Sequence, residues 1–473
     1  MNPAGNASLP IAIIGGGITG LAAAHRLVRQ GKTVRLFEAS SRLGGSIRSE
    51  RDGDWLVEGG PNSLQQTPAV AALLGELDLE AATLQARPEA KNRYLVRNGR
   101  LVAVPASPPA LLVSKLFSTG AKWRLLREIF TRPRTRPADV SLAAFVESHF
   151  GREWVDYGLS PFVSGVYAGD AEKLSARHSF PSLWAMEQSH GSIIRGQIAA
   201  AKARRARGEP AGAAPIVSFA DGLETLPRTL AARLPAGSVE LHARVTALVP
   251  PSAGQPWQIQ WTSPDSGSPP RSQLFSAVLL ALPAAALAEL SLPSAAASGS
   301  EPSDRPFASL ADIEYPPVSS LFLGYRSDQI DHPLDGFGLL VPPLERRSIM
   351  GVLFNSTLFP GRAPEDHVAL TVMTGGSRNP ELARLTDEAL LALVRDELAA
   401  LLGVRGDPVF VRRTVWPHAI PQYTLGYERF LETMTRAEQA HPGLFIGGHV
   451  RDGISLPACI AAGEKLAARS LST

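Results

Sequence analysis

The sequence contains almost no cysteine, and this scarcity limits the chemistry available to it. Cys459 is the single cysteine among 473 residues. An internal disulfide framework and a metal site built from clustered cysteines are therefore excluded. A lone free thiol is typical of proteins from reducing compartments, so we expect a cytoplasmic protein with no metal site.

Long hydrophobic runs and an excess of one charge are also missing. No stretch reaches the ~20 apolar residues that a membrane-spanning helix requires, and Met1–Pro10 lacks the basic and apolar segments of a secretory signal. With 47 basic against 44 acidic residues the net charge is only +3, so bulk charge gives no argument for a nucleic-acid partner. We expect a location in the cytoplasm, with peripheral attachment to the inner face of the cell membrane as an option.

The most informative stretch is glycine-rich and lies near the start of the chain. The apolar run Ile11–Ile14 is followed by Gly15, Gly17 and Gly20 in the spacing G-x-G-x-x-G, and a second apolar run ends in Glu38. This order is typical of a Rossmann-like dinucleotide-binding unit, in which a helix N-terminus faces the diphosphate and the acid binds ribose hydroxyls. The pattern predicts an α/β fold but does not distinguish NAD from FAD.

Two stretches just after this unit favour FAD. Ser41–Ser46 reads S-R-L-G-G-S, and Val57–Ser63 reads V-E-G-G-P-N-S. Both resemble the extended fingerprint of the flavin amine oxidases and their relatives, where paired glycines let the backbone approach the flavin diphosphate. That superfamily often carries a basic residue where this chain has Ser46. A side-chain contact there would be lost, while a backbone contact would remain.

A second sheet is predicted farther along the chain. Arg93–Val104 alternates apolar and polar residues around Asn98-Gly99, which is a strong hairpin signal. Four later stretches also alternate, which predicts an antiparallel or mixed sheet with one covered face. They are 318–325, 338–341, 349–354 and 368–374.

Residues 110–137 combine apolar and basic residues at helical spacing, including Lys115, Lys122, Arg127 and the loop Arg132–Arg136. Basic amphipathic helices of this kind either dock on an anionic membrane surface or form a helical subdomain with a solvated basic face. The sequence favours neither. A second charged stretch, Lys202–Pro210, is predicted to be a solvated loop, because no aromatic residues alternate with its charges as nucleic-acid binding would require.

Several motifs spread over the whole chain resemble one family. They are Gly165–Asp170 (G-V-Y-A-G-D), Phe180–Trp184 (F-P-S-L-W), Trp416–Tyr423 (W-P-H-A-I-P-Q-Y), the pair Gly447-Gly448, and Gly453–Leu456 (G-I-S-L). Together they resemble the protoporphyrinogen oxidases, the oxygen-dependent, FAD-containing enzymes of haem biosynthesis in the flavin amine oxidase superfamily.

The resemblance implies an α/β architecture in three parts. A discontinuous Rossmann-like FAD-binding domain is expected over 1–90, 211–290 and 416–473. A mixed-sheet substrate domain is expected over 91–109 and 291–415, and an α-helical membrane-facing domain over 110–210. A homodimer is one option for the assembly.

The activity implied by the resemblance is the oxidation of protoporphyrinogen IX to protoporphyrin IX. Six electrons leave the substrate, dioxygen accepts them, and hydrogen peroxide forms. Three alternatives stay open: oxidation of coproporphyrinogen III to coproporphyrin III, another oxidoreductase of the flavin amine or carotenoid type, and a haem-pathway scaffold that keeps FAD only as structure.

The resemblance also implies the site residues. No side chain can be named as a catalytic base. His449 stands beside the glycine pair and could touch the flavin. Tyr427 occupies a position where the family often carries a histidine. The residues implied to bind FAD are Gly15, Gly16, Gly17, Ile18, Thr19, Gly20, Glu38, Ala39, Arg42, Gly45, Ser46, Gly60, Pro61, Asn62, Ser63, Val245, Trp416, Gly448, His449, Ile454, Ser455 and Leu456.

Six residues are implied to bind the porphyrinogen. Arg93 would pair with a propionate, which its planar fork suits, and Gly165 would offer its carbonyl to pyrrole N–H groups. The residues expected to sandwich the macrocycle are Phe337, Leu340, Leu353 and Met373. Without the resemblance, Arg93 would be interpreted as a surface charge of the hairpin and these four as ordinary sheet core.

Overall fold

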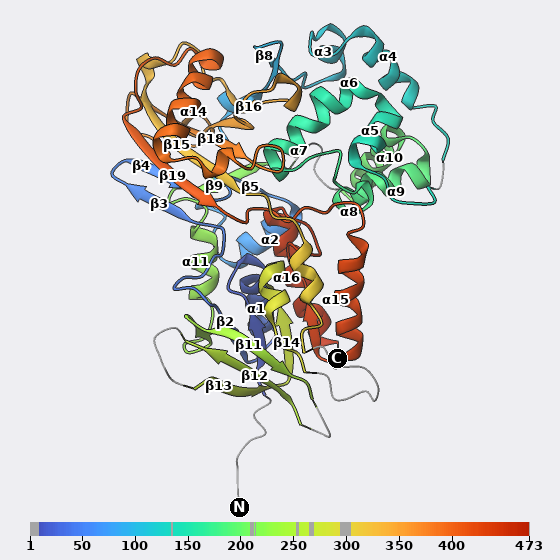
Figure 1. Cartoon of the computed structure of the whole chain (residues 1–473), viewed down its shortest axis with the longest axis vertical. Coiled ribbons are helices and arrows are strands. Elements are labelled where there is room, and N and C mark those ends of the chain that lie inside the picture. Colours follow the sequence, from blue (N-terminus) through green and yellow to red (C-terminus); the bar gives the residue numbers. More distant parts are fainter. Residues whose placement is uncertain are drawn as a thin grey trace, which may run out of the picture.

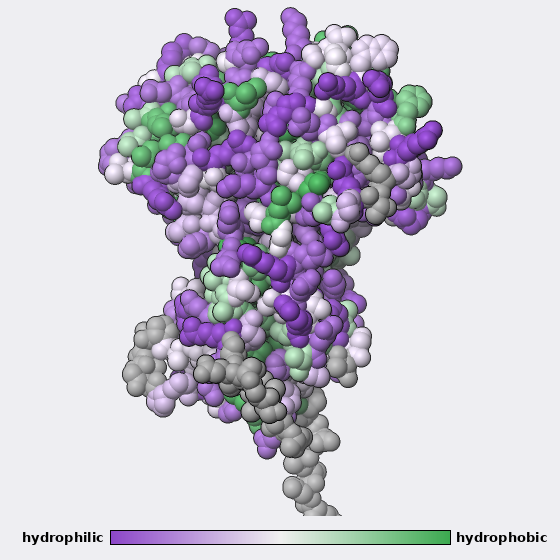
Figure 2. Space-filling view, turned by 45° about the vertical axis from the view of Figure 1, so that its right-hand side comes forward, coloured by the Kyte–Doolittle hydropathy of each residue, from purple (hydrophilic) through white to green (hydrophobic). Residues whose placement is uncertain are grey.

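The computed structural model describes residues 9–133, 136–208, 212, 214–251, 255–263, 269–293 and 304–472. The lower part in Figure 1 contains a parallel sheet and its helices, and the upper part contains a second sheet on the left and a group of helices on the right. The molecule narrows between these two parts, as the space-filling view in Figure 2 shows.

The lower sheet has five strands that come from distant parts of the chain. Their order is β10 (Val239–Glu240), β2 (Val34–Phe37), β1 (Ile11–Ile14), β14 (Ala277–Leu280) and β20 (Leu444–Ile446). Every neighbouring pair is parallel. The predicted Rossmann-like sheet is therefore present, and its apolar strands are uninterrupted because both faces are covered.

The two faces of β1 are covered by different layers. Ile11 and Ile13 pack with residues of α1 (Ile18–Arg29) and α16 (Leu456–Leu471). Ala12 and Ile14 point the other way, because side chains alternate along a strand. They pack with Trp257, Trp261 and Phe275 of a three-stranded sheet formed by β11 (Arg244–Val249), β12 (Trp257–Thr262) and β13 (Arg271–Phe275).

The upper sheet has seven strands and is mixed, as the alternating stretches predicted. Its order is β19 (Phe410–Trp416), β15 (Val318–Arg326), β18 (His367–Gly375), β17 (Gly351–Phe354), β16 (Gly336–Leu340), β7 (Asn92–Arg97) and β8 (Arg100–Ala103). Only the β16–β7 pair is parallel among these described strands. One face packs against α14 (Asp387–Leu402), which leaves the other face for the cavity described below.

The upper right of Figure 1 is helical. The helices are α3 (Pro108–Val113), α4 (Thr119–Glu128), α5 (Leu142–Phe150), α6 (Arg152–Trp154), α7 (Ser160–Tyr167), α8 (Ala176–Ser179), α9 (Pro181–His190) and α10 (Ile193–Ala206). In the part of the chain that the structure describes, no helix is both long enough and apolar enough to cross a bilayer.

The loop predicted over Lys202–Pro210 is wrong for its first five residues, which belong to α10. Ser192 caps this helix by accepting a hydrogen bond from the Arg195 amide at 3.0 Å. The following residues are mostly alanine and arginine, which are good helix formers, so the charges lie on a helix surface. Glu209, Pro210 and part of the predicted loop Arg132–Arg136 lie outside the described residues.

Candidate active site

A cavity of about 2110 Å³ runs from the glycine-rich turn of the lower part to the space between the upper sheet and the helices. Ligand pockets usually measure ~300–1,000 Å³, so this cavity has room for two ligands. All six residues predicted to bind substrate lie on its wall. So do the residues predicted to bind FAD, with the exception of Gly16, Gly20, Arg42 and Gly448.

The turn after β1 is shaped by glycines that act in two ways. A Cβ on Gly20 would lie 1.9 Å from the Gly15 carbonyl oxygen, so this glycine permits close packing of α1 on the strand end. A Cβ on Gly17 would meet nothing within 4 Å, because Gly17 faces the cavity. Gly17 is the N-cap of α1 and provides no side-chain cap. The first-turn amides of α1 are therefore available to an anionic diphosphate.

Glu38 stands at the end of β2 and lines the cavity. One carboxylate oxygen accepts a hydrogen bond from the Gly16 amide and the other from the Ser40 amide, both at 2.8 Å. Each carboxylate oxygen has a second lone pair, which leaves acceptor capacity for ribose hydroxyls. These contacts orient the carboxylate at the position where a dinucleotide ribose is bound in Rossmann-like folds.

Arg42 braces the next loop instead of lining the cavity. Its guanidinium donates to the carbonyl oxygens of Leu43, Gly45 and Ile47 at 3.1, 2.6 and 3.0 Å. Gly45 and Ser46 in this loop do line the cavity. Arg42 therefore acts on the cofactor end of the cavity through the shape of the loop.

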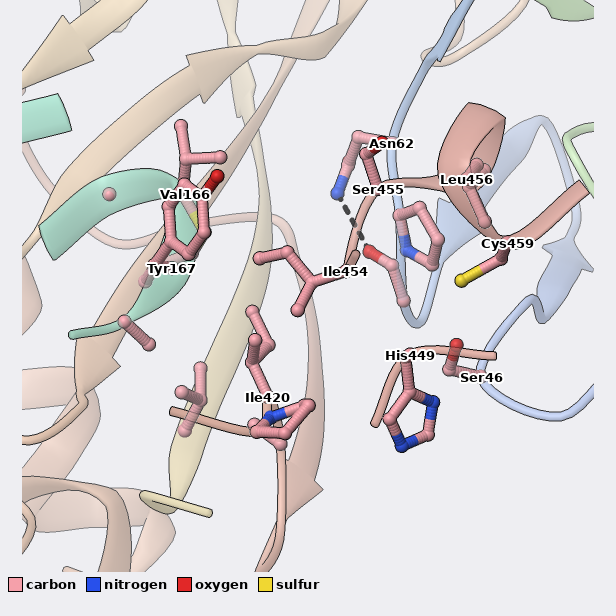
Figure 3. A pocket seen from close by; sticks show the side chains of 18 of the residues that line it. Ser46, Asn62, Val166, Tyr167, Ile420, His449, Ile454, Ser455, Leu456 and Cys459 are labelled. Atoms are coloured by element: carbon pink, nitrogen blue, oxygen red, sulfur yellow. Dashed lines mark hydrogen bonds between the residues drawn. The ribbon is translucent and has the colours of Figure 1, made fainter. Parts of the chain in front are cut away.

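The C-terminal segment forms the opposite wall of this end. Figure 3 shows His449, Ile454, Ser455 and Leu456 in the pocket with Ser46 and Asn62. The Tyr423 hydroxyl donates to the His449 carbonyl at 2.6 Å and accepts from the Gly453 amide at 3.0 Å, which fixes the turn between them. Burial lowers the pKa of His449 to about 4, so its ring is neutral at pH 7.

Tyr427, the departure from the family pattern, lies away from the cavity wall. Its side chain is fully buried, and its hydroxyl donates to the Val450 carbonyl at 2.7 Å. The phenol therefore anchors the segment that carries His449 and has no contact with the cavity. Among the described residues, Tyr427 therefore supports the fold and does not line the cavity.

The part of the cavity between the upper sheet and the helices is called the upper chamber. One of its walls is the open face of the seven-stranded sheet. Leu340, Leu353 and Met373 lie on the cavity wall, and the residue before each of them packs in the core with α14. This alternation follows from strand geometry. Periodicity could show that two faces exist, but it could not show which face would be left open.

The opposite wall comes from the helical segment, whose helices were predicted, although the role of its side chains as a cavity wall was not. It includes the π-helical turn η2 (Val155–Leu159) between α6 and α7. Such turns are frequent at functional sites. The side chains of this wall are apolar or aromatic, and no motif distinguishes them; they include Leu116, Phe117, Leu125, Leu126, Ile129, Tyr157 and Phe162.

Arg93 lies at the edge of the chamber and is exposed. Its guanidinium carbon is 5.4 Å from the centre of the Phe337 ring, which steers it along the wall. No carboxylate of the described residues pairs with it, whereas Arg97 on the same strand pairs with Glu153 at 2.8 Å. The guanidinium group of Arg93 is thus available to bind a carboxylate of a ligand.

Gly165 lies in the last turn of α7, against the sheet wall. A Cβ there would lie 2.3 Å from Cδ2 of Leu340. The Gly169 amide, which would normally bond the Gly165 carbonyl, donates to Val163 at 3.3 Å. The Gly165 carbonyl therefore lacks its intrahelical donor and can accept a hydrogen bond from a ligand.

Comparisons with known proteins identify the family. Residues 18–471 match the family described as flavin containing amine oxidoreductase. Protoporphyrinogen oxidase 2, chloroplastic/mitochondrial, of Arabidopsis thaliana is 35% identical over 478 residues, which cover 97% of this chain and 92% of that protein. Protoporphyrinogen oxidase of Bos taurus is 34% identical over 493 residues, with 98% of each chain covered.

Solved structures show the same fold at lower identity. A crystal structure of a protein from Exiguobacterium sp. 255-15 superposes with a TM-score of 0.77 at 22% identity, covering 98% of this chain and 99% of that one. Reduced UDP-galactopyranose mutase superposes with a TM-score of 0.72 at 16% identity, covering 98% and 96%. The predicted family and cofactor are confirmed: the chain is an FAD-containing oxidoreductase that belongs to the protoporphyrinogen oxidase family of the flavin containing amine oxidoreductases.

Proposed function

We propose that this protein oxidises protoporphyrinogen IX to protoporphyrin IX in haem biosynthesis, with dioxygen as the electron acceptor and hydrogen peroxide as the second product. The relatives named protoporphyrinogen oxidase support the substrate. The observation that carries the proposal is that the cavity is continuous: it joins the apolar upper chamber to the glycine-rich turn that would bind a dinucleotide. A flat macrocycle in the chamber would lie beside the cofactor.

The cofactor end would hold FAD through backbone amides more than through side chains. The first turn of α1 would face the diphosphate, Glu38 would bind the ribose, and β11 around Val245 would contact the adenine. FAD, when bound, supplies a two-electron acceptor for hydride from a bridging carbon of the macrocycle. Removal of six electrons then requires three rounds on one substrate molecule.

The chain's own contribution in the chamber is orientation and exclusion of water. Leu340, Leu353 and Met373 cover one face of the macrocycle, and the helical wall covers the other. The Gly165 carbonyl would accept pyrrole N–H bonds, which fixes the rotation of the ring within its plane. Arg93 would bind a propionate at the edge.

The charge of the chamber favours protoporphyrinogen over coproporphyrinogen. Among the described residues of β7, β16–β18, α3, α4, η2 and α7 that line it, Arg93 is the only ionised side chain. Coproporphyrinogen carries additional propionates, and an unpaired carboxylate against an apolar wall costs free energy. The vinyl groups of protoporphyrinogen suit that wall.

We also propose that the helical segment docks on an anionic membrane surface. Val113, Trp123 and Phe130 are 84%, 62% and 80% exposed. Leu126, also on the cavity wall, is 52% exposed, so the cavity opens beside these apolar side chains. Hydrophobic patches of the upper part are visible between strongly hydrophilic areas in Figure 2.

Anaerobic mixing of the holoenzyme with each porphyrinogen tests the proposed reaction. Protoporphyrinogen should bleach the flavin absorbance rapidly, and admission of air should restore it with porphyrin fluorescence and hydrogen peroxide. A preference for coproporphyrinogen would replace the proposed substrate. Absence of bleaching with both would refute the proposed reaction and leave the FAD site intact.

Substitution Arg93→Ala should raise KM for protoporphyrinogen by roughly 10-fold or more, since charge-assisted hydrogen bonds contribute ~1.5–3 kcal/mol. FAD content should stay unchanged, because Arg93 lies in the upper chamber. Arg100→Ala, in the same hairpin but off the cavity wall, is the matched control. Equal KM values for the two variants would eliminate the propionate role.

Flotation with anionic liposomes tests the membrane proposal. The wild-type protein should float at low salt, and the double variant Trp123→Glu/Phe130→Glu should lose most of this binding, because apolar insertion and attraction would both be weakened. Val411→Glu, which changes a 44% exposed valine on β19, is the control and should float. Failure of the wild-type protein to float would count against docking.

A further inference from the structure

Tyr315 and His449 form a hydrogen-bonded pair on the cavity wall that the proposed reaction does not use. The Tyr315 hydroxyl oxygen lies 3.1 Å from Nε2 of His449, and the rings are 6.0 Å apart at 76°. Tyr315 also accepts a hydrogen bond from the Ala284 amide at 3.2 Å. Tyr315 lies just before β15. No motif in the sequence distinguishes it.

The contacts around the pair favour Tyr315 as the hydrogen-bond donor. The Ala284 amide can only donate, so the Tyr315 oxygen is an acceptor in that contact. Nε2 of His449 is the only acceptor that the described residues offer to the Tyr315 hydroxyl hydrogen. With Tyr315 as the donor to Nε2, the hydroxyl hydrogen has an acceptor and the single proton of the neutral imidazole resides on Nδ1. With Nε2–H as the donor, the hydroxyl hydrogen would have no acceptor among the described residues.

The pKa values of both groups agree with this assignment. Burial lowers the pKa of His449 to about 4. Burial also raises the pKa of the Tyr315 hydroxyl well above its usual range. At neutral pH the ring carries one proton and the phenol keeps its own.

His449 lines the cavity, and its Nδ1 is the ring nitrogen that Tyr315 does not contact. It has no hydrogen-bond partner within the described chain, and it is not among the buried polar atoms shut off from solvent. The preceding residue, Gly448, lies beside the first turn of α1, since a Cβ there would be 3.5 Å from Oγ1 of Thr19. His449 thus lies on the cavity wall beside the first turn of α1, the region that would hold the dinucleotide.

We propose that Tyr315 is a positioning residue for the cofactor: by occupying Nε2, it holds His449 as the Nδ1–H tautomer, which donates a hydrogen bond to an oxygen atom of bound FAD. The inference rests on the FAD placement given under the proposed function. It does not depend on which porphyrinogen is oxidised.

The rate of FAD release from the holoenzyme tests this role, followed as the rise of flavin fluorescence after dilution with no porphyrinogen present. Tyr315→Phe keeps the ring and should release FAD ~3- to 10-fold faster, and His449→Leu ~10-fold faster, as expected for loss of one hydrogen bond. His449→Asn restores a donor near the position of Nδ1 and should stay within ~2-fold of wild type.

The double variant Tyr315→Phe/His449→Asn separates positioning from general loss of structure. If Tyr315 acts through the imidazole, Tyr315→Phe should have no further effect in the His449→Asn background. Tyr325→Phe removes a buried hydroxyl from the core of the upper sheet, off the cavity wall, and should leave the release rate unchanged. An equal acceleration by Tyr315→Phe in both backgrounds, or none in the wild type, would overturn the proposal.

Nitrogen NMR of the histidine ring gives a readout independent of FAD affinity. With ¹⁵N-labelled histidine, His449 should show a protonated Nδ1 and an unprotonated Nε2 at neutral pH in the holoenzyme, and Tyr315→Phe should reduce this tautomer preference. A dominant Nε2–H tautomer in the wild-type holoenzyme would refute the assignment even if every variant folds and retains FAD.

Discussion

The contact on which the rest of the structure depends is the packing of α1 between β1 and α16, where only glycine fits between the backbones. At one side a Cβ on Gly20 would lie 1.9 Å from the Gly15 carbonyl oxygen. At the other, a Cβ on Gly463 of α16 would lie 2.4 Å from the Thr19 carbonyl oxygen. Backbone atoms this close to an added Cβ could move away only if whole elements moved. Glycine at both positions is therefore required for this packing.

This packing determines where the two halves of the proposed cofactor site meet. It leaves the first turn of α1 without a side-chain cap and facing the cavity. It also brings the segment before α16 to the opposite wall, although His449 is separated from α1 by most of the chain. The tyrosine hydroxyls at Tyr315, Tyr423 and Tyr427 then anchor that segment through hydrogen bonds. The proposed cofactor and substrate regions form one cavity, because residues of the lower part and of the open face of the upper sheet line it together.

Much of the lower part could be predicted from the sequence, because its signals are local. The glycine spacing, the apolar run before it and the acid after it lie within a few dozen residues, and they specify the turn whatever the rest of the chain does. The alternating strands of the upper sheet were predictable for the same reason. The face left open was not, since it depends on α14 covering the other one.

The helical wall, α15 (Glu428–Ala440) and Tyr315 could not be predicted for a different reason. Phe117 and Tyr157 look like ordinary core residues in the sequence, and only tertiary packing places them on the cavity. The charges of 202–206 suggested a loop, although alanine and arginine also favour a helix. Tyr315 acquires its partner His449 through a contact across 134 positions, which no local pattern records.

A crystal structure of the holoenzyme with bound protoporphyrin tests the central claim most directly, that one cavity aligns cofactor and substrate. The account predicts the FAD diphosphate at the first turn of α1, the macrocycle against Leu340 and Leu353, and a propionate on Arg93. A macrocycle bound outside this chamber, or one whose propionates avoid Arg93 and whose ring lies away from the flavin, would contradict it.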